Sequence, residues 1–137
     1  MRMLLLISML GVGMCGQPRP FDPRIDVPLD EPFPLRVEQS ADITGTPLRL
    51  HFVAVTEDSR CPADVVCVWA GNARVQLRAE RGGDGDSEEV RLNTGLDPRS
   101  ASVFGYAITL EEVAPGRRTD TPLPAGDYVA TLRVTKP

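Results

Sequence analysis

Apolar and polar residues alternate with a period of two over most of this chain from Phe33 onward. A period of two places successive side chains on opposite faces of a strand, so the pattern predicts β-strands with one buried face. No segment beyond the apolar N-terminus keeps a 3.6-residue apolar period for three turns. In the clearest run, residues 47–55, one face carries Leu48, Leu50, Phe52 and Ala54, and the other carries Arg49 and His51.

Turn-forming residues divide this pattern into short strands, about six or seven of them. Residues 73–93 are predicted to form a β-hairpin whose long tip, residues 81–87, is dense in Gly and Asp. Such strands over about 105 residues are typical of an antiparallel β-sandwich. We expect an immunoglobulin-like sandwich over residues 33–137, and a small β-barrel is the alternative. Further strands are expected at 33–39, 104–113 and 126–135, with loops at 40–46 and 114–126.

Composition limits the core and the partners. Aromatic residues make up only 5% of the chain, so Val, Leu, Ile and Ala must form most of the core. The chain has 15 Lys and Arg against 19 Asp and Glu, for a formal net charge of −4. Because nucleic-acid-binding domains usually carry a basic surplus, nucleic acid is not an expected partner.

The N-terminus has the features of an export signal. Met1 and Arg2 precede an apolar run from Met3 to Met14. This run is too short for a helix that crosses a bilayer, which needs about 20 residues, but it suits the apolar region of a signal peptide. Residues 1–14 are therefore predicted to be a signal peptide, and the protein is expected in the cell envelope, facing the periplasm or the cell exterior.

Cys15 is the predicted attachment point for lipid. Residues 12–16, Val-Gly-Met-Cys-Gly, resemble a bacterial lipobox, although Met14 stands where Gly, Ala or Ser is usual. The chain has 3 cysteines, and an odd thiol in an exported protein needs an explanation. Acylation of Cys15 would supply it and make membrane lipid a partner. Conventional cleavage and an uncleaved anchor are the alternatives.

Residues 15–32 read as a proline-rich tether behind that cysteine. Proline fixes φ and lacks an amide donor, which disfavours regular structure. Residues 16–24 are predicted to be linker. Residues 25–32 are undecided, because the alternation over 25–29 is also compatible with the edge of a sheet, where proline is tolerated.

Cys61 and Cys67 are the second notable feature. Five residues separate them, which is neither the redox C-x-x-C spacing nor a zinc-knuckle spacing. In an exported protein, a local disulfide is the default. Trp69 lies two residues beyond Cys67, so on a strand it would project to the same side and cover the disulfide.

A braced loop of this kind has residue types that binding surfaces favour. The candidate binding residues are Asp58, Arg60, Asp64 and Trp69. Asp58, Arg60 and Asp64 are expected to form an exposed ion pair, worth about 0–1 kcal/mol. The alternative is that the disulfide only braces a strand connection.

The segment D-S-R-C-P followed by C-x-W-A-G resembles a family of small exported bacterial proteins, many of them lipoprotein-like, that has no assigned function. The resemblance covers residues 47–135 and implies the fold and the location without implying a reaction. Its matching residues are Asp58, Ser59, Arg60, Cys61, Pro62, Cys67, Trp69, Ala70, Gly71, Gly105, Tyr106, Ile108, Thr109, Leu110, Tyr128, Leu132 and Val134.

Metal and catalytic sites are the less favoured interpretations. Cys61 and Cys67 with His51 could bind zinc or copper, but a fourth ligand is not evident, and His51 is expected to be solvated. No nucleophile-elbow motif accompanies His51. We expect no cofactor and no catalytic residue. Asp84, Asp86, Glu88 and Glu89 could hold calcium but lack the EF-hand order.

The sequence therefore predicts a non-enzymatic, lipid-anchored envelope domain that presents a disulfide-braced loop to an envelope protein or another ligand. A periplasmic inhibitor of a protease or other hydrolase is the alternative function, and a metal-binding protein is the second alternative.

Overall fold

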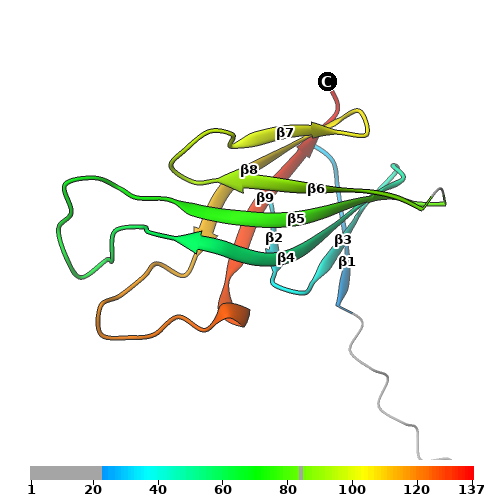
Figure 1. Cartoon of the computed structure of the whole chain (residues 1–137). Coiled ribbons are helices and arrows are strands. Elements are labelled where there is room, and N and C mark those ends of the chain that lie inside the picture. The colour runs from blue at the N-terminus through cyan, green and yellow to red at the C-terminus, as the bar shows by residue number, and fades with distance from the viewer. Residues whose placement is uncertain (1–22, 84) are drawn as a thin grey trace, which may run out of the picture.

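A computed structural model describes residues 23–83 and 85–137, which form a two-layer β-sandwich (Figure 1). The five-stranded sheet has the order β1-β3-β4-β5-β6, and the four-stranded sheet has the order β2-β9-β8-β7. The first comprises β1 (Arg24–Val27), β3 (Ser40–Ile43), β4 (Leu48–Asp58), β5 (Ala73–Arg81) and β6 (Asp86–Asn93). The second comprises β2 (Phe33–Arg36), β7 (Ser100–Val103), β8 (Tyr106–Ala114) and β9 (Val129–Thr135), and a 3₁₀ turn, η1 (Ala125–Asp127), precedes β9.

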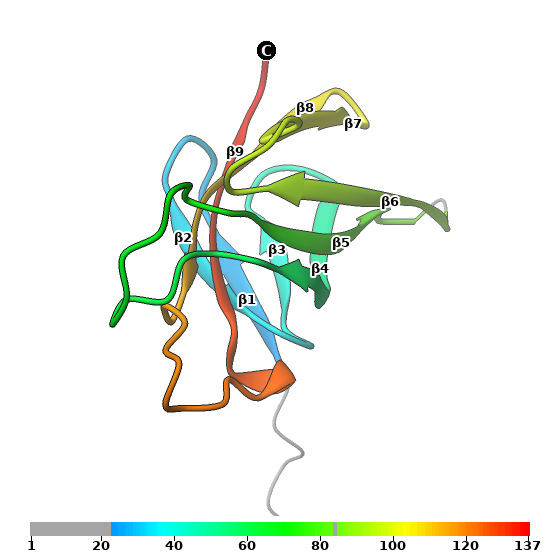
Figure 2. The same cartoon turned by 60° about the vertical axis from the view of Figure 1, so that its left-hand side comes forward.

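The predicted all-β sandwich is confirmed, and the barrel alternative is wrong, because both sheets are open. Two open sheets packed face to face make a β-sandwich, and the immunoglobulin-like assignment within that class stays a prediction. The strand order consists of two meanders, β3 to β6 in one sheet and β7 to β9 in the other. Neighbouring strands pair antiparallel except β1 and β3, which pair in parallel. Figure 2 shows the two layers from a second direction.

The predicted alternation places the core between the sheets. Leu48, Leu50 and Phe52 of β4 are fully buried or nearly so, at 2%, 0% and 0% exposure. The register shifts between Phe52 and Ala54, so Ala54 leaves the buried face and is only half-buried. The largest fully buried side chains are Phe52, Leu35, Ile43, Leu48, Leu50, Leu77, Leu92, Ile108, Leu110, Leu132, Val75 and Val134.

The sandwich begins earlier than residue 33, where the sequence placed its start. Residues 24–27 form β1, which pairs with β3 from Arg24↔Ser40 to Val27↔Ile43. Val27 is buried, and Ile25 and Leu29 pack against the core. The last part of the expected tether therefore belongs to the domain, because its apolar residues pack against the core at the edge of the sheet.

The expected strand over residues 104–113 is also corrected. Phe104 and Gly105 have φ of 50° and 81°. Two consecutive positive φ angles are typical of the central residues of a two-residue hairpin turn. Phe104 and Gly105 connect β7 to β8, with Val103 opposite Tyr106. β7 was absent from the sequence prediction because its Ser-Ala-Ser-Val sequence carries little apolar signal.

The β5–β6 hairpin forms as predicted, with Arg81 opposite Asp86 at its tip. Within the residues that the structure describes, no helix is long and apolar enough to cross a bilayer.

Candidate functional site

The β4–β5 connection, residues 59–72, projects beyond the end of the sandwich beside the connection between β8 and η1 (Figures 1 and 2). Cys61 and Cys67 form the predicted disulfide within it, with their Cα atoms 5.9 Å apart. We call residues 59–72 the disulfide loop. Its ends continue the hairpin ladder, because Ser59 N–H donates to the carbonyl of Asn72 and Cys61 N–H donates to that of Ala70.

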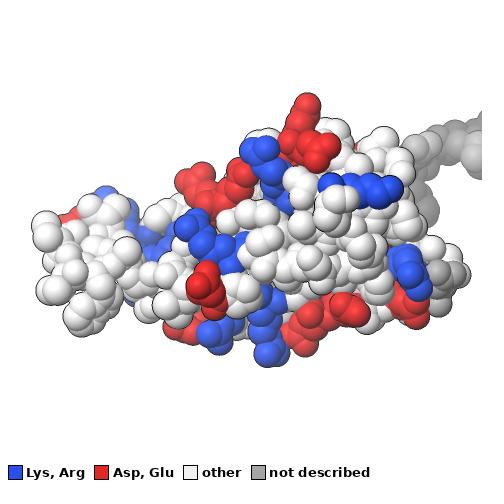
Figure 3. Space-filling model, turned by 90° about the horizontal axis from the view of Figure 1, so that it is seen from above, with Lys and Arg blue, Asp and Glu red and all other residues white. Residues whose placement is uncertain are grey.

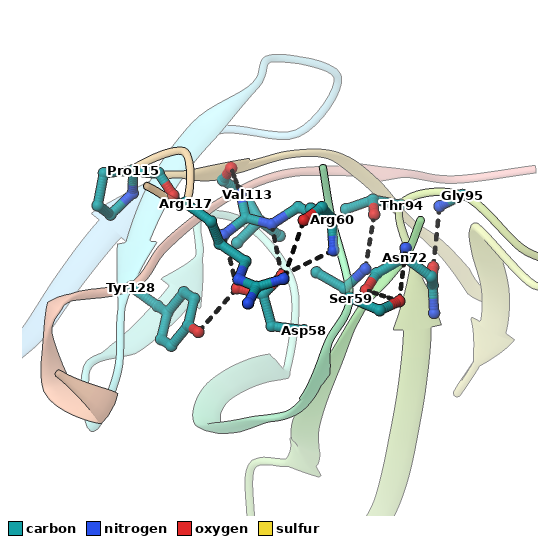
Figure 4. Close-up of polar contacts among 11 residues, drawn as sticks. Asp58, Ser59, Arg60, Asn72, Thr94, Gly95, Val113, Pro115, Arg117 and Tyr128 are labelled. Carbon is teal, nitrogen blue, oxygen red and sulfur yellow. Dashed lines mark hydrogen bonds and ion pairs between the residues drawn. The ribbon is translucent and has the colours of Figure 1, made fainter. Parts of the chain in front are cut away.

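A bidentate ion pair lies at the base of the disulfide loop (Figure 4). Nε of Arg60 donates to Oδ1 of Asp58 at 2.8 Å, and Nη2 donates to Oδ2 at 2.9 Å. The hydroxyl of Tyr128 donates to Asp58 Oδ2 at 2.8 Å. Asp58 ends β4 and Tyr128 precedes β9, so this carboxylate connects the two sheets.

Arg60 also caps a strand of the opposite sheet. Its Nη1 donates to the carbonyl of Val113 at 2.7 Å, and its Nη2 donates to that of Pro115 at 3.0 Å. The guanidinium carbon lies 5.9 Å from the ring centroid of Tyr128. We call Asp58, Arg60 and Tyr128, with the carbonyls of Val113 and Pro115, the Arg60 cluster.

The Arg60 cluster keeps its ionisable groups in one protonation state. Burial opposes ionisation of Asp58, but the hydrogen bonds from Arg60 and Tyr128 outweigh it, so the pKa of Asp58 lies below its ordinary value. The hydrogen bond to Asp58 raises the pKa of Arg60. Burial and the hydrogen bond to Asp58 raise the pKa of Tyr128. An anionic Asp58, a cationic Arg60 and a neutral Tyr128 therefore coexist over a wide pH range.

Asp58 and Arg60 were expected on an exposed recognition loop, and the structure corrects this. Their side chains are only 10% and 14% exposed. Because the carboxylate and guanidinium groups are already satisfied internally, these residues hold the loop in place and offer little surface for contact with a partner.

The connection between β8 and η1 braces the other side of the disulfide loop. Arg117 Nη1 donates to the carbonyl of Arg60 at 3.0 Å, and Ala63 N–H donates to the carbonyl of Arg117 at 2.8 Å. Asp64, expected as a binding residue, accepts hydrogen bonds from the N–H and hydroxyl of Thr119. These bonds lower the pKa of Asp64. Asp64 therefore anchors one loop to the next, and it does not pair with Asp58 or Arg60 as the sequence suggested.

A buried polar contact joins the disulfide loop to the loop after β6. Asn72 and Asn93 are each 3% exposed, and Asn72 Nδ2 donates to Asn93 Oδ1 at 3.0 Å. Gly95 N–H donates to Asn72 Oδ1 at 2.9 Å. Gly71 has φ +72°, and a Cβ there would lie 1.8 Å from the carbonyl oxygen of Ser59. This close approach explains the glycine that ends the C-x-W-A-G segment.

The tip of the disulfide loop is apolar and exposed. Val66, Val68 and Trp69 are 101%, 94% and 76% exposed. We call Val65, Val66, Val68 and Trp69 the apolar tip. The expectation that Trp69 covers the disulfide from a strand is wrong, because residues 59–72 form no strand and the indole projects into solvent.

The exposed apolar side chains gather at one end of the sandwich. Among the described residues, the exposed large hydrophobic side chains are the apolar tip and Leu96. Leu96 lines a shallow groove together with Trp69, Gly71 and Gly95. In Figure 3 the projecting end of the molecule has few charged side chains, whereas charged side chains of both signs are scattered over the rest of that face. Scattered apolar side chains are normal on a protein surface, but a concentrated patch marks an interaction site.

The residues considered for metal binding do not converge. Cys61 and Cys67 are joined to each other, so neither offers a thiolate. His51 was expected to be solvated, but its side chain is 17% exposed, and its Nδ1 lies 2.8 Å from the hydroxyl of Ser40. Over residues 23–83 and 85–137 no three His, Cys, Asp or Glu side chains are grouped as a metal site. Asp84 and Cys15, the predicted lipidation site, lie outside the described residues.

Sequence reasoning missed three residues that hold this end together. Tyr128 was expected only as part of the strand at 126–135 and as a residue of the family resemblance, and Asn72 and Asn93 carried no expectation. Tyr128 lies 70 residues from Asp58 and Asn93 lies 21 residues from Asn72, and no local pattern reports a partner at such a separation.

Comparison of the chain with protein-family models, with curated proteins and with solved structures found no match.

Proposed function

We propose that this protein is an exported, lipid-anchored and non-enzymatic domain of the cell envelope that binds a partner through the apolar tip of its disulfide loop. One observation carries the binding role. Among the described residues, the exposed large apolar side chains lie at a single end: the apolar tip is on a loop held by a disulfide and by the Arg60 cluster, and Leu96 lies beside it. A loop ordered in advance loses less conformational entropy on binding.

Export and the anchor rest on residues 1–15. The apolar run before Cys15 supports export, and the Cys61–Cys67 disulfide is in keeping with an oxidising compartment. Metabolic labelling with palmitate tests the anchor. Wild-type protein should incorporate the label, and C15A should not. An unlabelled wild type, or equal labelling of C15A, would contradict lipidation.

Capture from envelope fractions tests the binding role. The full chain is immobilised as wild type, as V66D/V68D, and as the control S87D/S102D. The control adds the same charge at exposed positions of β6 and β7. Components retained by the wild type and the control, but lost with V66D/V68D, would support binding through the tip. Equal retention by all three proteins would contradict it.

Inhibition of a hydrolase is the second candidate. It is favoured by residues 63–66, which are exposed inside the ring closed by Cys61 and Cys67, so a chain cleaved there would stay joined through the disulfide. A panel of hydrolase assays tests this function. Inhibition by the wild type that V66D/V68D lacks would support it, and full activity of every enzyme at excess protein would count against it.

A further inference from the structure

The apolar tip has the chemistry of a surface that enters an apolar phase. Between Cys61 and Asn72 the only charged residue is Asp64, which is engaged by Thr119. Val66 and Val68 offer no hydrogen-bonding side-chain group, and Trp69 offers one indole N–H.

These residue types fit a fluid apolar phase better than a protein pocket. Protein interfaces carry about one hydrogen bond per 100–200 Å², and valine is under-represented among the residues that dominate their affinity. Tryptophan, in contrast, is enriched where a membrane meets water, because its ring is apolar and its N–H is polar. The tip also projects from the sandwich (Figures 1 and 2), so it could reach a bilayer while the charged sheets stay in water.

The backbone of the loop limits how deep such insertion could go. Cys61 N–H is bonded to Ala70, and Val65 N–H is bonded to Pro62, so part of the backbone is satisfied internally. Irregular backbone is not tolerated in the hydrocarbon core. The depth that suits this loop is the boundary between headgroups and acyl chains, about 5–10 Å into the bilayer.

Charge does not draw this protein to anionic lipid. The chain has a formal net charge of −4, and the exposed arginines near the loop face carboxylates: Arg118 pairs with Asp120, and Arg74 pairs with Glu57. The attraction would therefore be hydrophobic and insensitive to salt.

We infer that the apolar tip of the disulfide loop inserts into the interfacial region of a lipid bilayer. This inference rests on the proposed function, since it names a lipid surface as the partner of the same loop.

Trp69 is the single tryptophan of the chain, so its fluorescence reports the position of the tip without a label. The full chain is mixed with phosphatidylcholine vesicles, and sedimentation identifies the bound fraction. In bound wild type we expect the Trp69 emission to shift to shorter wavelength, and acrylamide quenching to fall several-fold. Bromine on the lipid acyl chains should quench the emission. The shift should persist at high salt and in S87D/S102D, and it should be lost in V66D/V68D.

An unchanged Trp69 spectrum in vesicle-bound wild type would overturn the inference, as would absence of binding or an equal shift in V66D/V68D. The capture experiment separates this failure from failure of the proposed function. If the tip leaves vesicles untouched but still retains an envelope protein that V66D/V68D loses, the lipid partner is wrong and the binding role stands. If neither vesicles nor an envelope component depend on the tip, both fail.

Discussion

Arg60 is the side chain on which the geometry of the disulfide loop depends most. It neutralises Asp58, and it satisfies two carbonyls of the opposite sheet, on Val113 and Pro115. Its removal would leave a shielded carboxylate without its counter-ion, which is more destabilising than the loss of one hydrogen bond.

R60A should therefore lower the free energy of unfolding by about 3 kcal/mol, near the lower end of the range for breaking a buried pair. Urea denaturation measures this change. R118A is the matched control, because Arg118 and its partner Asp120 are 51% and 61% exposed. It should cost less than about 0.5 kcal/mol. Equal losses of unfolding free energy in R60A and R118A would show that the Arg60 cluster stabilises the fold no more than an exposed ion pair does.

Acidification should weaken the Arg60 cluster through Asp58. The pKa of Asp58 is lower in the folded protein than its ordinary value, so the unfolded chain takes up the proton first as the pH falls. The stability that ionised Asp58 contributes is complete above about pH 5 and declines as the pH drops below about 4 toward the folded pKa.

The comparison that isolates this effect is wild type against D58N. The stability difference between the two proteins, measured by urea denaturation, should be constant from pH 6 to 8, which is far above both pKa values, and should shrink below about pH 4. A difference that grows on acidification would contradict the direction assigned to the Asp58 pKa.

Among the loops and strands, the disulfide loop is set by close backbone packing as well as by its covalent bond. Gly71 combines φ +72° with a position at which a Cβ would lie 1.8 Å from the carbonyl oxygen of Ser59. Gly45 has nearly the same φ, +78°, but open space around it. Comparing alanine substitutions at Gly45 and Gly71 therefore separates the cost of the left-handed backbone conformation from the cost of the steric clash with Ser59.

G45A should cost about 1 kcal/mol, the penalty for a left-handed conformation with a Cβ. G71A should cost clearly more, because Ser59 must also move and the Ser59–Asn72 hydrogen bond must break. Thermal or urea unfolding of both variants measures this. Equal losses of stability in G45A and G71A would mean that Ser59 can move away at little cost and that the base of the loop is not tightly packed.

The disulfide should contribute locally. Closing about seven residues gives roughly 2.4 kcal/mol by loop-closure entropy, and the hydrogen bonds at the loop base already restrain the same segment. C61S/C67S should therefore fold and lose at most about 2.4 kcal/mol in urea denaturation. Failure of this variant to fold would show instead that the core depends on the disulfide.

The strands were more predictable than the loops because alternation is a local signal. The alternation of Leu48, Leu50 and Phe52 indicates a buried face within five residues. The pairing of Cys61 with Cys67 was predictable because the two residues are close in the chain. β3 and β7 were missed, because four-residue strands carry too little periodicity, and the expected loop at 40–46 is wrong over Ser40–Ile43. The sequence leaves β1 undecided between tether and sheet edge, and it is an edge strand. Trp69 was misplaced because two-residue spacing has meaning only on a strand, and this segment is not one.

At the scale of the whole molecule, the two sheets supply the stable core, and the end that carries the disulfide loop supplies the proposed binding surface. The core residues of both sheets are ordinary aliphatic side chains of a stable scaffold. The Arg60 cluster lies where both sheets end, and its hydrogen bonds hold the irregular segment beyond β4 in place as it projects from the sandwich. The sequence predicted that a braced loop exists, but which of its residues face solvent depended on contacts as distant as Arg60 with Pro115.

Photo-crosslinking in intact cells tests whether the apolar tip is where this protein binds. A photoreactive amino acid replaces Val66 in one strain and exposed Ser87, on β6 in the other half of the molecule, in a second strain. We expect irradiation to yield a crosslink, to lipid or to an envelope protein, from position 66 and little or none from position 87. Crosslinks of equal yield at both positions, or none from position 66, would contradict a binding surface at the tip.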